Sequence, residues 1–179
     1  MNLTMRKAAE ADLLAAEAIL MDGKATLKAQ GIPQWQGDYP SGVDVASDIE
    51  QGIGYVATGE TGAPLGYVAL SFDGEKTYDV IDGAWLTSSD TAAPRYAVTH
   101  RCAVSAAAAH TGVMSFMLRG CERLSRERGC ESMRIDTHEK NLPMQGLIAK
   151  LGYTACGSIV LAHEEGPDAL RLAYEKLLR

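Results

Sequence analysis

The sequence has no long apolar run and no excess of positive charge. No stretch is apolar enough to cross a bilayer, and the first residues, Met1–Arg6, lack the apolar core of a signal peptide. The formal net charge is −6, so the chain has no overall field that would draw it onto nucleic acid or an anionic membrane. These absences predict a cytoplasmic protein that binds neither membranes nor nucleic acids.

Cysteines are few and follow no recognisable pattern. The four show no CxxC spacing and stand at Cys102, Cys121, Cys130 and Cys156. Scattered cysteines in a chain without an export signal are typically reduced and buried, so Cys102 is interpreted as a small core residue rather than a nucleophile. The sequence also lacks an HExxH motif and any Cys/His spacing typical of zinc sites, so we predict no metal.

What the chain does contain is an ordinary globular composition, 46% apolar and 22% charged. With a length of 179 residues, this predicts one domain over residues 1–179 with a full hydrophobic core. Positive charge gathers locally at Arg119, Arg123, Arg126 and Arg128. Such a run is typical of the solvated face and last turns of a helix, and it could alternatively hold an anionic cofactor.

The spacing of apolar residues predicts a mixed order of strands and helices. Helices are expected from Leu13 towards Gly31, over 43–51, from Gly112 to Gly129 and from Asn141 to Gly152. Strands are expected over residues 3–8, 53–58, 65–72, 78–81, 96–104, 133–137 and 154–161. Residues 170–178 fit a strand and a helix equally well. The order of elements is typical of an α+β protein.

The stretch Arg101–Met114 is the most informative for chemistry. A strand ends at Val104, a loop of small residues follows, and a helix begins near Gly112. A helix N-terminus offers free N–H groups and a partial positive charge, which suits a pyrophosphate, and small residues allow close approach to the backbone. The alternative is an ordinary connection between a strand and a helix.

This strand, loop and helix resemble the acyl-CoA-binding motif of the GNAT acetyltransferase superfamily. The resemblance extends to Arg6 after a first strand, to Asn141, and to Leu151-Gly152-Tyr153 after the next helix. Further segments are similar to an uncharacterised bacterial subgroup: residues 31–36, 82–87, 100–101, 134–138 and 173–176. The resemblance implies the GNAT fold, an α+β architecture with a mixed, mostly antiparallel sheet of about seven strands and about four helices.

The resemblance also implies an activity, direct transfer of an acetyl group from acetyl-CoA to a primary amine of a small molecule or peptide. The residues it implies for the cofactor are Ala103, Val104, Ala109, His110, Thr111, Gly112, Val113, Met114 and Asn141. Of the family's loop pattern only Gly112 is kept, and Met114 stands where the family has Gly or Ala. Where many members have a Tyr that protonates the leaving thiolate, this chain has Ile148.

An amine must lose a proton before it attacks a thioester, so a general base is expected. His138 is the first choice, because it follows the strand that the family places beside the acetyl group. Asp136 lies two residues earlier, and His100 on the neighbouring strand is the second choice. Each could instead make structural hydrogen bonds. Trp35 and Tyr39, in an irregular segment, are expected to cover the acceptor site or, alternatively, to plug the core.

Two rival functions remain open on the sequence. The altered loop and Ile148 also fit a catalytically inactive GNAT-like domain that binds a ligand or a partner. A hydrolase using Asp136 and His138 is the second rival. A homodimer is an assembly that the sequence allows.

Overall fold

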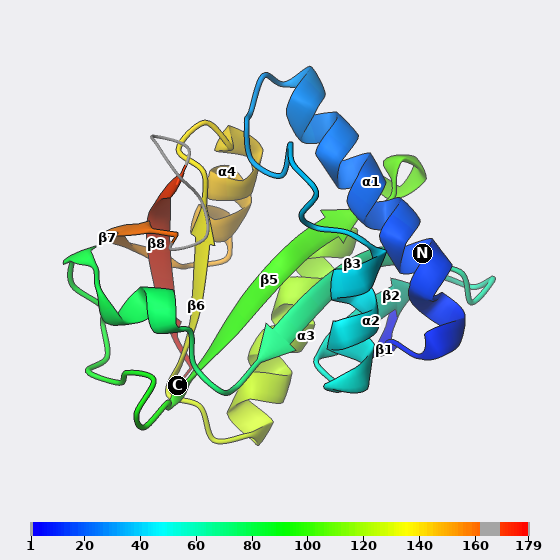
Figure 1. Ribbon diagram of the computed structural model, residues 1–179. Coiled ribbons are helices and arrows are strands. Elements are labelled where there is room, and N and C mark those ends of the chain that lie inside the picture. Colours follow the sequence, from blue (N-terminus) through cyan, green and yellow to red (C-terminus); the bar gives the residue numbers. More distant parts are fainter. Residues whose placement is uncertain (1, 162–168, 179) are drawn as a thin grey trace. The chain divides into compact units, whose positions relative to one another are not determined.

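The computed structural model describes residues 2–161 and 169–178 (Figure 1). The chain forms two compact units: the first comprises residues 1–70 and 100–121, and the second residues 71–99 and 122–179. The boundaries between the units fall within two strands and one helix, β3 (at its last residue, Ser71), β5 and α3, so each of these elements contributes to both units.

Four α-helices are present among the described residues, as expected. They are α1 (Leu13–Ala29), α2 (Gly42–Glu50), α3 (Val113–Glu127) and α4 (Leu142–Lys150). The glycines predicted to end helices do so with left-handed backbone: φ is 69° at Gly31, 82° at Gly129 and 85° at Gly152. Short 3-10 helices accompany them in the part of the chain that the structure describes, among them η1 (Glu10–Asp12), η2 (Lys76–Asp79) and η3 (Ala106–Ala108).

The described residues contain eight strands in one sheet, with the order β1-β2-β3-β5-β6-β8-β7-β4. Their bounds are β1 (Thr4–Lys7), β2 (Gly54–Thr58), β3 (Pro64–Ser71), β4 (Asp82–Gly83), β5 (Tyr96–Val104), β6 (Ser132–Thr137), β7 (Thr154–Val160) and β8 (Leu170–Leu177). β5 and β6 are parallel, with Val98 opposite Arg134, whereas β1–β2, β2–β3, β4–β7, β6–β8 and β7–β8 are antiparallel. The mixed, mostly antiparallel sheet of the predicted α+β fold is confirmed.

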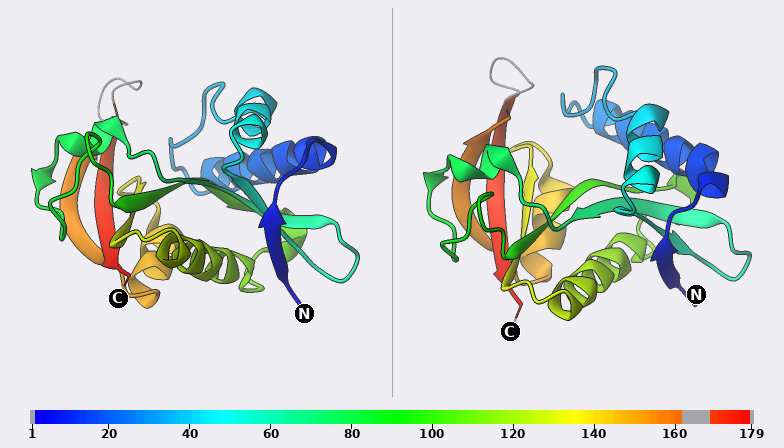
Figure 2. Two further views of the ribbon diagram at one scale, coloured as in Figure 1. Left: turned by 90° about the horizontal axis from the view of Figure 1, so that it is seen from below. Right: turned by 60° about the horizontal axis from the view of Figure 1, so that its bottom comes forward.

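The first unit packs α1 and α2 against the sheet. Its core joins both helices to β2, β3 and β5 through Ala8, Ala16, Ile19, Leu20, Val45, Val56, Tyr67 and Ala103. Figure 2 shows α1 and α2 on one face of these strands and the beginning of α3 on the other. Asp12 directly precedes α1. Its carboxylate, however, accepts hydrogen bonds from Arg6 and the Ala9 N–H instead of capping α1.

The second unit has a separate apolar core. Tyr78, Tyr96, Val98, Ile159 and Ala173 form it, and Ile81, Trp85 and Leu161 pack against it. β8 pairs with β6, with Glu175 opposite Arg134 and Ala173 opposite Asp136. The segment that fits both periodicities is therefore a strand, because β8 pairs on one side with β6 and on the other with β7.

One predicted strand is wrong. Residues 78–81 were expected to be extended, but residues 76–79 form η2, and the strand of this region is the two-residue β4. The Glu75 carboxylate accepts a hydrogen bond from the Thr77 N–H, and the Tyr78 N–H donates to the Glu75 carbonyl, so local polar contacts favour a turn. Tyr78 and Val80 would share one face of a strand, but Tyr78 is buried and Val80 is 79% exposed, so the segment does not show strand alternation. β4 takes the place of the expected strand over 78–81, and β8, in the segment that the sequence left ambiguous, brings the strands of the described residues from the expected seven to eight.

No helix among the described residues combines the length and the apolar character that a crossing of the bilayer requires.

Candidate active site

The first unit holds the loop that the sequence predicts to bind a pyrophosphate. β5 ends at Val104, and the Ser105 N–H donates to the Leu65 carbonyl of β3 at 2.9 Å. The loop then makes the single turn η3, whose first N–H, that of Ala106, donates to the Asp22 carboxylate of α1 at 2.7 Å. The beginning of the loop is thereby attached to both β3 and α1.

The loop backbone turns sharply just before α3. His110 has a φ of 61° and Gly112 a φ of 88°, both in the left-handed region. A Cβ on Gly112 would meet no atom within 4 Å, so the backbone conformation rather than space favours glycine there. Residues 109–112 are exposed, and the first N–H groups of α3 have no partner within the helix. Free donors and the positive end of the helix dipole therefore meet at an exposed loop, which suits a phosphate.

The side chains of this loop differ in what they can offer a ligand. Val113 is 1% exposed and belongs to the core, so its predicted contact with a cofactor can come only from its backbone. Thr111 hydrogen-bonds inside the loop, since its N–H and its hydroxyl both donate to the Ala108 carbonyl. Met114, in the first turn of α3, is half-buried. The chemistry of the loop is thus mainly that of its backbone.

Trp35, predicted to cover an acceptor site, lies beside a strand residue predicted to hold the cofactor. A Cβ on Gly23 of α1 would lie 3.3 Å from the Ala103 Cβ and 3.4 Å from the Trp35 Cζ3, so both side chains border the same point of α1. Trp35 is half-buried against the core of the first unit. The predicted cofactor and acceptor residues of the first unit are therefore neighbours at this point.

Tyr39 belongs to a buried polar network that the sequence did not reveal. The Arg101 guanidinium donates to both oxygens of Asp48, at 2.8 and 2.5 Å, and to the Tyr39 hydroxyl at 2.9 Å. The Tyr67 hydroxyl donates to Asp48 at 2.7 Å. Arg101 itself has a left-handed φ of 53° within β5. Arg101 and Asp48 thus join four segments of the first unit through one ion pair.

Charge pairing keeps this network ionised. Burial would lower the pKa of Arg101, but Tyr39 and Asp48 outweigh it, and the pKa is raised above its ordinary value. Burial, reinforced by the Asp48 carboxylate, raises the pKa of the Tyr67 hydroxyl. Tyr67 therefore stays a neutral donor and Arg101 a cation throughout the physiological pH range. In the sequence, Arg101 stands out only as part of the pair His100-Arg101, one of the segments that resemble the bacterial subgroup. No feature of the sequence identifies Asp48 as the partner of Arg101.

Asp136 lies near the end of β6 in the second unit. Its carboxylate accepts a hydrogen bond from the Tyr78 hydroxyl at 2.6 Å, and the Arg171 Nε is 4.0 Å from its second oxygen. Burial, together with the negative charge of Asp136, raises the pKa of Tyr78 well above its ordinary value, so Tyr78 remains a donor to the carboxylate. Sequence spacing placed Asp136 correctly on β6 but gave no sign of Tyr78 or Arg171.

His138 follows the end of β6 and is 2% exposed. Its Nδ1 accepts a hydrogen bond from the Lys140 N–H at 3.1 Å. A neutral imidazole that accepts at Nδ1 carries its proton on Nε2. A role as base therefore requires His138 to release Lys140 or to change tautomer. Because β6 ends at Thr137, His138 is not on the continuous strand face that would pair it with Asp136.

Asn141, at the expected start of the helix, caps α4. Its Oδ1 accepts from the Met144 N–H at 3.2 Å, and its own N–H donates to the His138 carbonyl at 2.9 Å. The turn after β6 is thereby closed by His138, Lys140 and Asn141. Contact between Asn141 and a cofactor stays a prediction. Ile148, on the same helix, is fully buried in the core and cannot transfer a proton.

A buried ion pair beneath Trp85 was not foreseen. The Arg134 Nε donates to the Glu175 Oε1 at 3.0 Å, and both side chains have no exposed surface. The guanidinium lies 4.4 Å from the Trp85 ring centroid and 3.8 Å from that of Tyr96. The pair forms because the register of β6 and β8 sets these two residues opposite each other.

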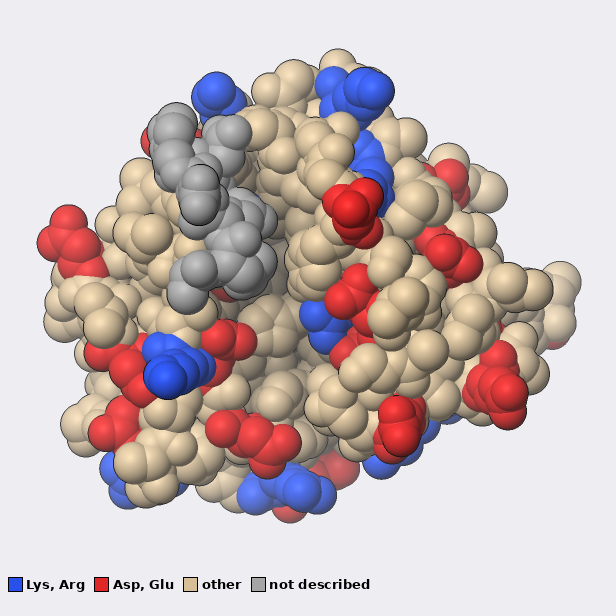
Figure 3. Space-filling model, viewed as in Figure 1, with Lys and Arg blue, Asp and Glu red and all other residues tan. Residues whose placement is uncertain are grey.

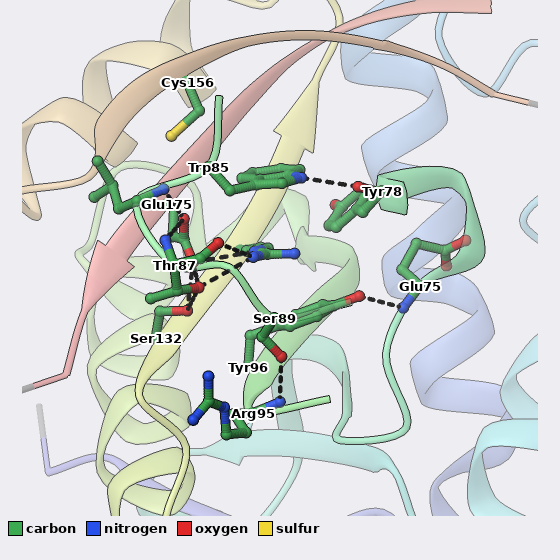
Figure 4. Close-up of polar contacts among 12 residues, drawn as sticks. Glu75, Tyr78, Trp85, Thr87, Ser89, Arg95, Tyr96, Ser132, Cys156 and Glu175 are labelled. Carbon is green, nitrogen blue, oxygen red and sulfur yellow. Dashed lines mark hydrogen bonds and ion pairs between the residues drawn. The ribbon is translucent and has the colours of Figure 1, made fainter. Parts of the chain in front are cut away.

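Hydrogen bonds tie the segment before β5 to this ion pair (Figure 4). Glu175 accepts from the Leu86 N–H, the Thr87 hydroxyl and the Ser132 hydroxyl, at 2.5, 2.7 and 2.5 Å. Burial alone would raise the pKa of Glu175, but the hydrogen bonds from Ser132 and Thr87 and the charge of Arg134 lower it below its ordinary value. The Trp85 indole N–H donates to the Tyr78 carbonyl at 2.8 Å, which links the ion pair to the residue that binds Asp136.

Comparison with known proteins identifies the family. The model of the acetyltransferase (GNAT) family matches residues 29–153, which include the whole of β5, the loop and α3. The chain belongs to the GNAT acetyltransferase family.

Solved structures of GNAT acetyltransferases show the same fold. A GNAT-family acetyltransferase from Streptococcus agalactiae 2603 is 31% identical over 98% of this chain and 95% of that one, with a TM-score of 0.85. The ribosomal-protein-S18-alanine N-acetyltransferase from Escherichia coli is 14% identical over 99% and 94% of the two chains, with a TM-score of 0.66, and shows the fold alone. No protein of curated function matches this sequence.

The GNAT residues predicted for the site fall into two groups. The first unit holds His100, Trp35, Tyr39, Ala103, Val104 and residues 109–114. The second unit holds Asp136, His138 and Asn141. In the part of the chain that the structure describes, no three His, Cys, Asp or Glu side chains are arranged to hold a metal ion. The roles of these residues in catalysis and binding stay predictions.

Proposed function

We propose that this GNAT protein is an N-acetyltransferase that moves the acetyl group of acetyl-CoA directly to a primary amine. The observation that carries the proposal is the loop before α3, where His110 and Gly112 turn the backbone and leave N–H donors at an exposed helix N-terminus. The membership of the chain in an acetyltransferase family supports the same cofactor.

In this proposal the cofactor binds along β5 and the loop that follows it. The backbone of Ala103 and Val104 holds the pantetheine arm, and residues 109–114 hold the pyrophosphate. Because Val113 is buried and Thr111 bonds within the loop, the donors to the phosphates are backbone N–H groups of this segment. Asn141 touches the cofactor while it caps α4.

The chemistry requires removal of a proton from the acceptor. A lysine-like amine has a pKa of about 10.4 and a thiol one of about 8.5, so the amine needs a base more than the leaving thiolate needs an acid. His138, Asp136 and His100 are the proposed candidates for that base. The replacement of the usual tyrosine by Ile148 is therefore compatible with turnover, since a thiolate leaves without a strong acid.

The proposed acceptor is a small molecule or peptide with a free amine, bound next to Trp35 and Tyr39. Both side chains lie beside β5, at Ala103 and Arg101 respectively. The proposed enzyme is cytoplasmic, and its formal net charge of −6 supports the absence of nucleic-acid and membrane partners.

Calorimetry tests the cofactor site. Acetyl-CoA is expected to bind with a dissociation constant of about 1 μM, roughly −8 kcal/mol. Gly112→Asp puts a carboxylate at the proposed phosphate site and should weaken binding at least about tenfold, or 1.4 kcal/mol.

Gly129→Asp is the matched control. Gly129 has a φ of 82° and open space around it at the other end of α3, so the same substitution brings the same backbone strain without a phosphate nearby. Equal loss of binding in both variants, or no heat with wild type at about 1 mM acetyl-CoA, would contradict the proposal.

A second function is favoured by two residues. Ile148 lies in the core and Met114 interrupts the family's loop pattern, which fits a GNAT domain that binds a ligand without turnover. Acetyl-CoA binding without release of CoA, across a panel of primary amines, would favour this function over the enzyme.

A further inference from the structure

The outer side of α1 carries an apolar stripe that the first unit does not use. Leu14, Ala18, Met21 and Ala25 recur at i, i+4, i+7 and i+11, and all four are exposed, Leu14 to 77%. On an α-helix this spacing places them along one side. The opposite side is the one that packs into the core, through Ala16, Ile19, Leu20 and Leu27. α1 is therefore apolar on two sides, and only one of them is covered within the chain.

The exposed surface extends beyond the helix. Val43, the second residue of α2, is 80% exposed. It follows Gly42, whose N–H donates to the Glu17 carboxylate of α1 at 3.1 Å, so it borders the same side of the molecule. Apolar side chains that gather on one surface typically mark an interaction site, whereas single exposed ones do not.

We propose that this surface pairs with the same surface of a second copy of the chain, α1 against α1 in antiparallel orientation. The stripe is complementary to itself in size. A two-fold axis between Ile19 and Leu20 sets Leu14 against the partner copy's alanine at position 25, and Ala18 against its methionine at position 21. Each large side chain then meets a small one, as close packing of two helices requires.

Charge at the ends of the stripe selects the orientation. Glu10 lies four residues before Leu14, and Lys28 lies three residues after Ala25; both are exposed. The antiparallel arrangement sets Glu10 of each copy near Lys28 of the other, whereas a parallel one sets like charges together. Glu17 and Lys24, on the same flank, are already bonded to the Gly42 N–H and the Gly37 carbonyl of their own chain.

The pairing is a weak one. From Leu14 to Ala25 the stripe is only about 17 Å long at 1.5 Å per residue. Interfaces of this size belong to the small, transient class, so we expect a dimer that dissociates at micromolar concentration. This inference is independent of acetyl transfer, since it uses only the exposed side of α1. Figure 3 shows both signs of charge interspersed over the face viewed in Figure 1.

Sedimentation velocity across about 1–500 μM protein tests the pairing. Wild type should shift from monomer to dimer in this range. Met21→Glu places a charge within the stripe and should raise the dimer dissociation constant at least about tenfold. Because Met21 is 39% exposed, the fold should survive, which circular dichroism would verify. Val80→Glu is the control: Val80 is 79% exposed in the second unit, and its substitution should leave the dimer unchanged.

Charge reversal tests the orientation. Glu10→Lys and Lys28→Glu should each weaken the dimer about fivefold, and the double variant should restore it. A wild type that stays monomeric at all concentrations, or a Met21→Glu dimer as tight as wild type, overturns the proposal. Failure of the double variant to recover overturns the antiparallel arrangement.

Discussion

Met114 stands in the first turn of α3, where the GNAT pattern has Gly or Ala. In the proposed site, a thioether there would hinder the approach of the pyrophosphate to the helix N-terminus. Met114→Gly should therefore tighten acetyl-CoA binding in calorimetry, although glycine costs up to about 1 kcal/mol of helix propensity. Ser115→Gly makes the same backbone change in the same turn and should leave affinity unchanged. Weaker binding by a folded Met114→Gly variant would mean that Met114 contacts the cofactor favourably.

The candidate bases can be separated by single substitutions. His138→Gln should lower the turnover rate by about 10²–10⁴-fold and leave the affinity for acetyl-CoA nearly unchanged, because a base acts only on the acceptor's proton. The rate is measured with the amine that releases CoA fastest in a panel, and the acidic limb of the pH–rate profile should flatten.

His100→Gln and Asp136→Asn are the comparison variants. His138 accepts a hydrogen bond from the Lys140 N–H, so it must release that bond or change tautomer before it takes a proton. The comparison variants test whether His100 or Asp136 is the base instead. Full activity of His138→Gln with loss in one of the others would move the role to that residue. Full activity in all three would mean that the amine arrives deprotonated and that the protein mainly positions it.

Single residues were predicted well where a local rule decides them. Asn141 as a cap and Gly112 as the turn before α3 follow from backbone requirements visible in the sequence. The Arg101–Asp48 pair could not be predicted, because its partners are 53 positions apart and meet only when α2 packs on β5. Arg101 also departs from ordinary strand backbone, which no pattern of residue types announces.

At the scale of elements, periodicity and glycine punctuation gave β5 its observed bounds and α3 and α4 nearly theirs. The 3-10 turn η2 was missed because its tyrosine is buried through a hydrogen bond with a distant strand. The ambiguous last segment illustrates the same limit, since only its pairing with β6 and β7 makes it a strand. Sequence patterns record the burial of a residue but not the element that buries it.

The pairing of β6 with β8 makes a pH-dependent contribution to stability through Glu175. Removing one partner of a buried ion pair costs about 3–5 kcal/mol, so Glu175→Gln should lower the free energy of unfolding by that order at pH 7. The pKa of Glu175 is lowered in the folded protein, so its contribution is complete above the unfolded-state pKa of about 4.3 and is lost as pH falls through the folded value.

Urea unfolding of wild type and Glu175→Gln between about pH 7 and pH 3 measures this dependence. The difference between the two proteins should be largest at neutral pH and should narrow below about pH 4.3. Glu127→Gln is the control, because Glu127 pairs with Arg123 on an exposed helix face and should contribute at most about 1 kcal/mol. A difference that stays constant with pH would show that folding does not lower the pKa of Glu175, and would contradict the prediction.

For the whole molecule, the resemblance carried the α+β fold and the family, while the division into two compact units had no sequence signal. β5 and α3 cross the boundary between the units, so no linker composition marks it. A single domain over residues 1–179 would unfold in one cooperative transition. The positions of strands and helices do not show whether the two units unfold together.

The two tryptophans offer that measurement, because each unit contains one: Trp35 packs on the first core and Trp85 on Arg134 in the second. Indole emission responds to solvent, so Trp85→Phe leaves a fluorophore that reports the first unit, and Trp35→Phe one that reports the second. If the chain is one cooperative domain, each variant should show the same urea midpoint by fluorescence as by circular dichroism. If the fluorescence of one variant changes at a lower urea concentration than the circular dichroism of the same variant, the two units unfold separately. The chain thus carries its own pair of optical reporters, one for each half of the fold.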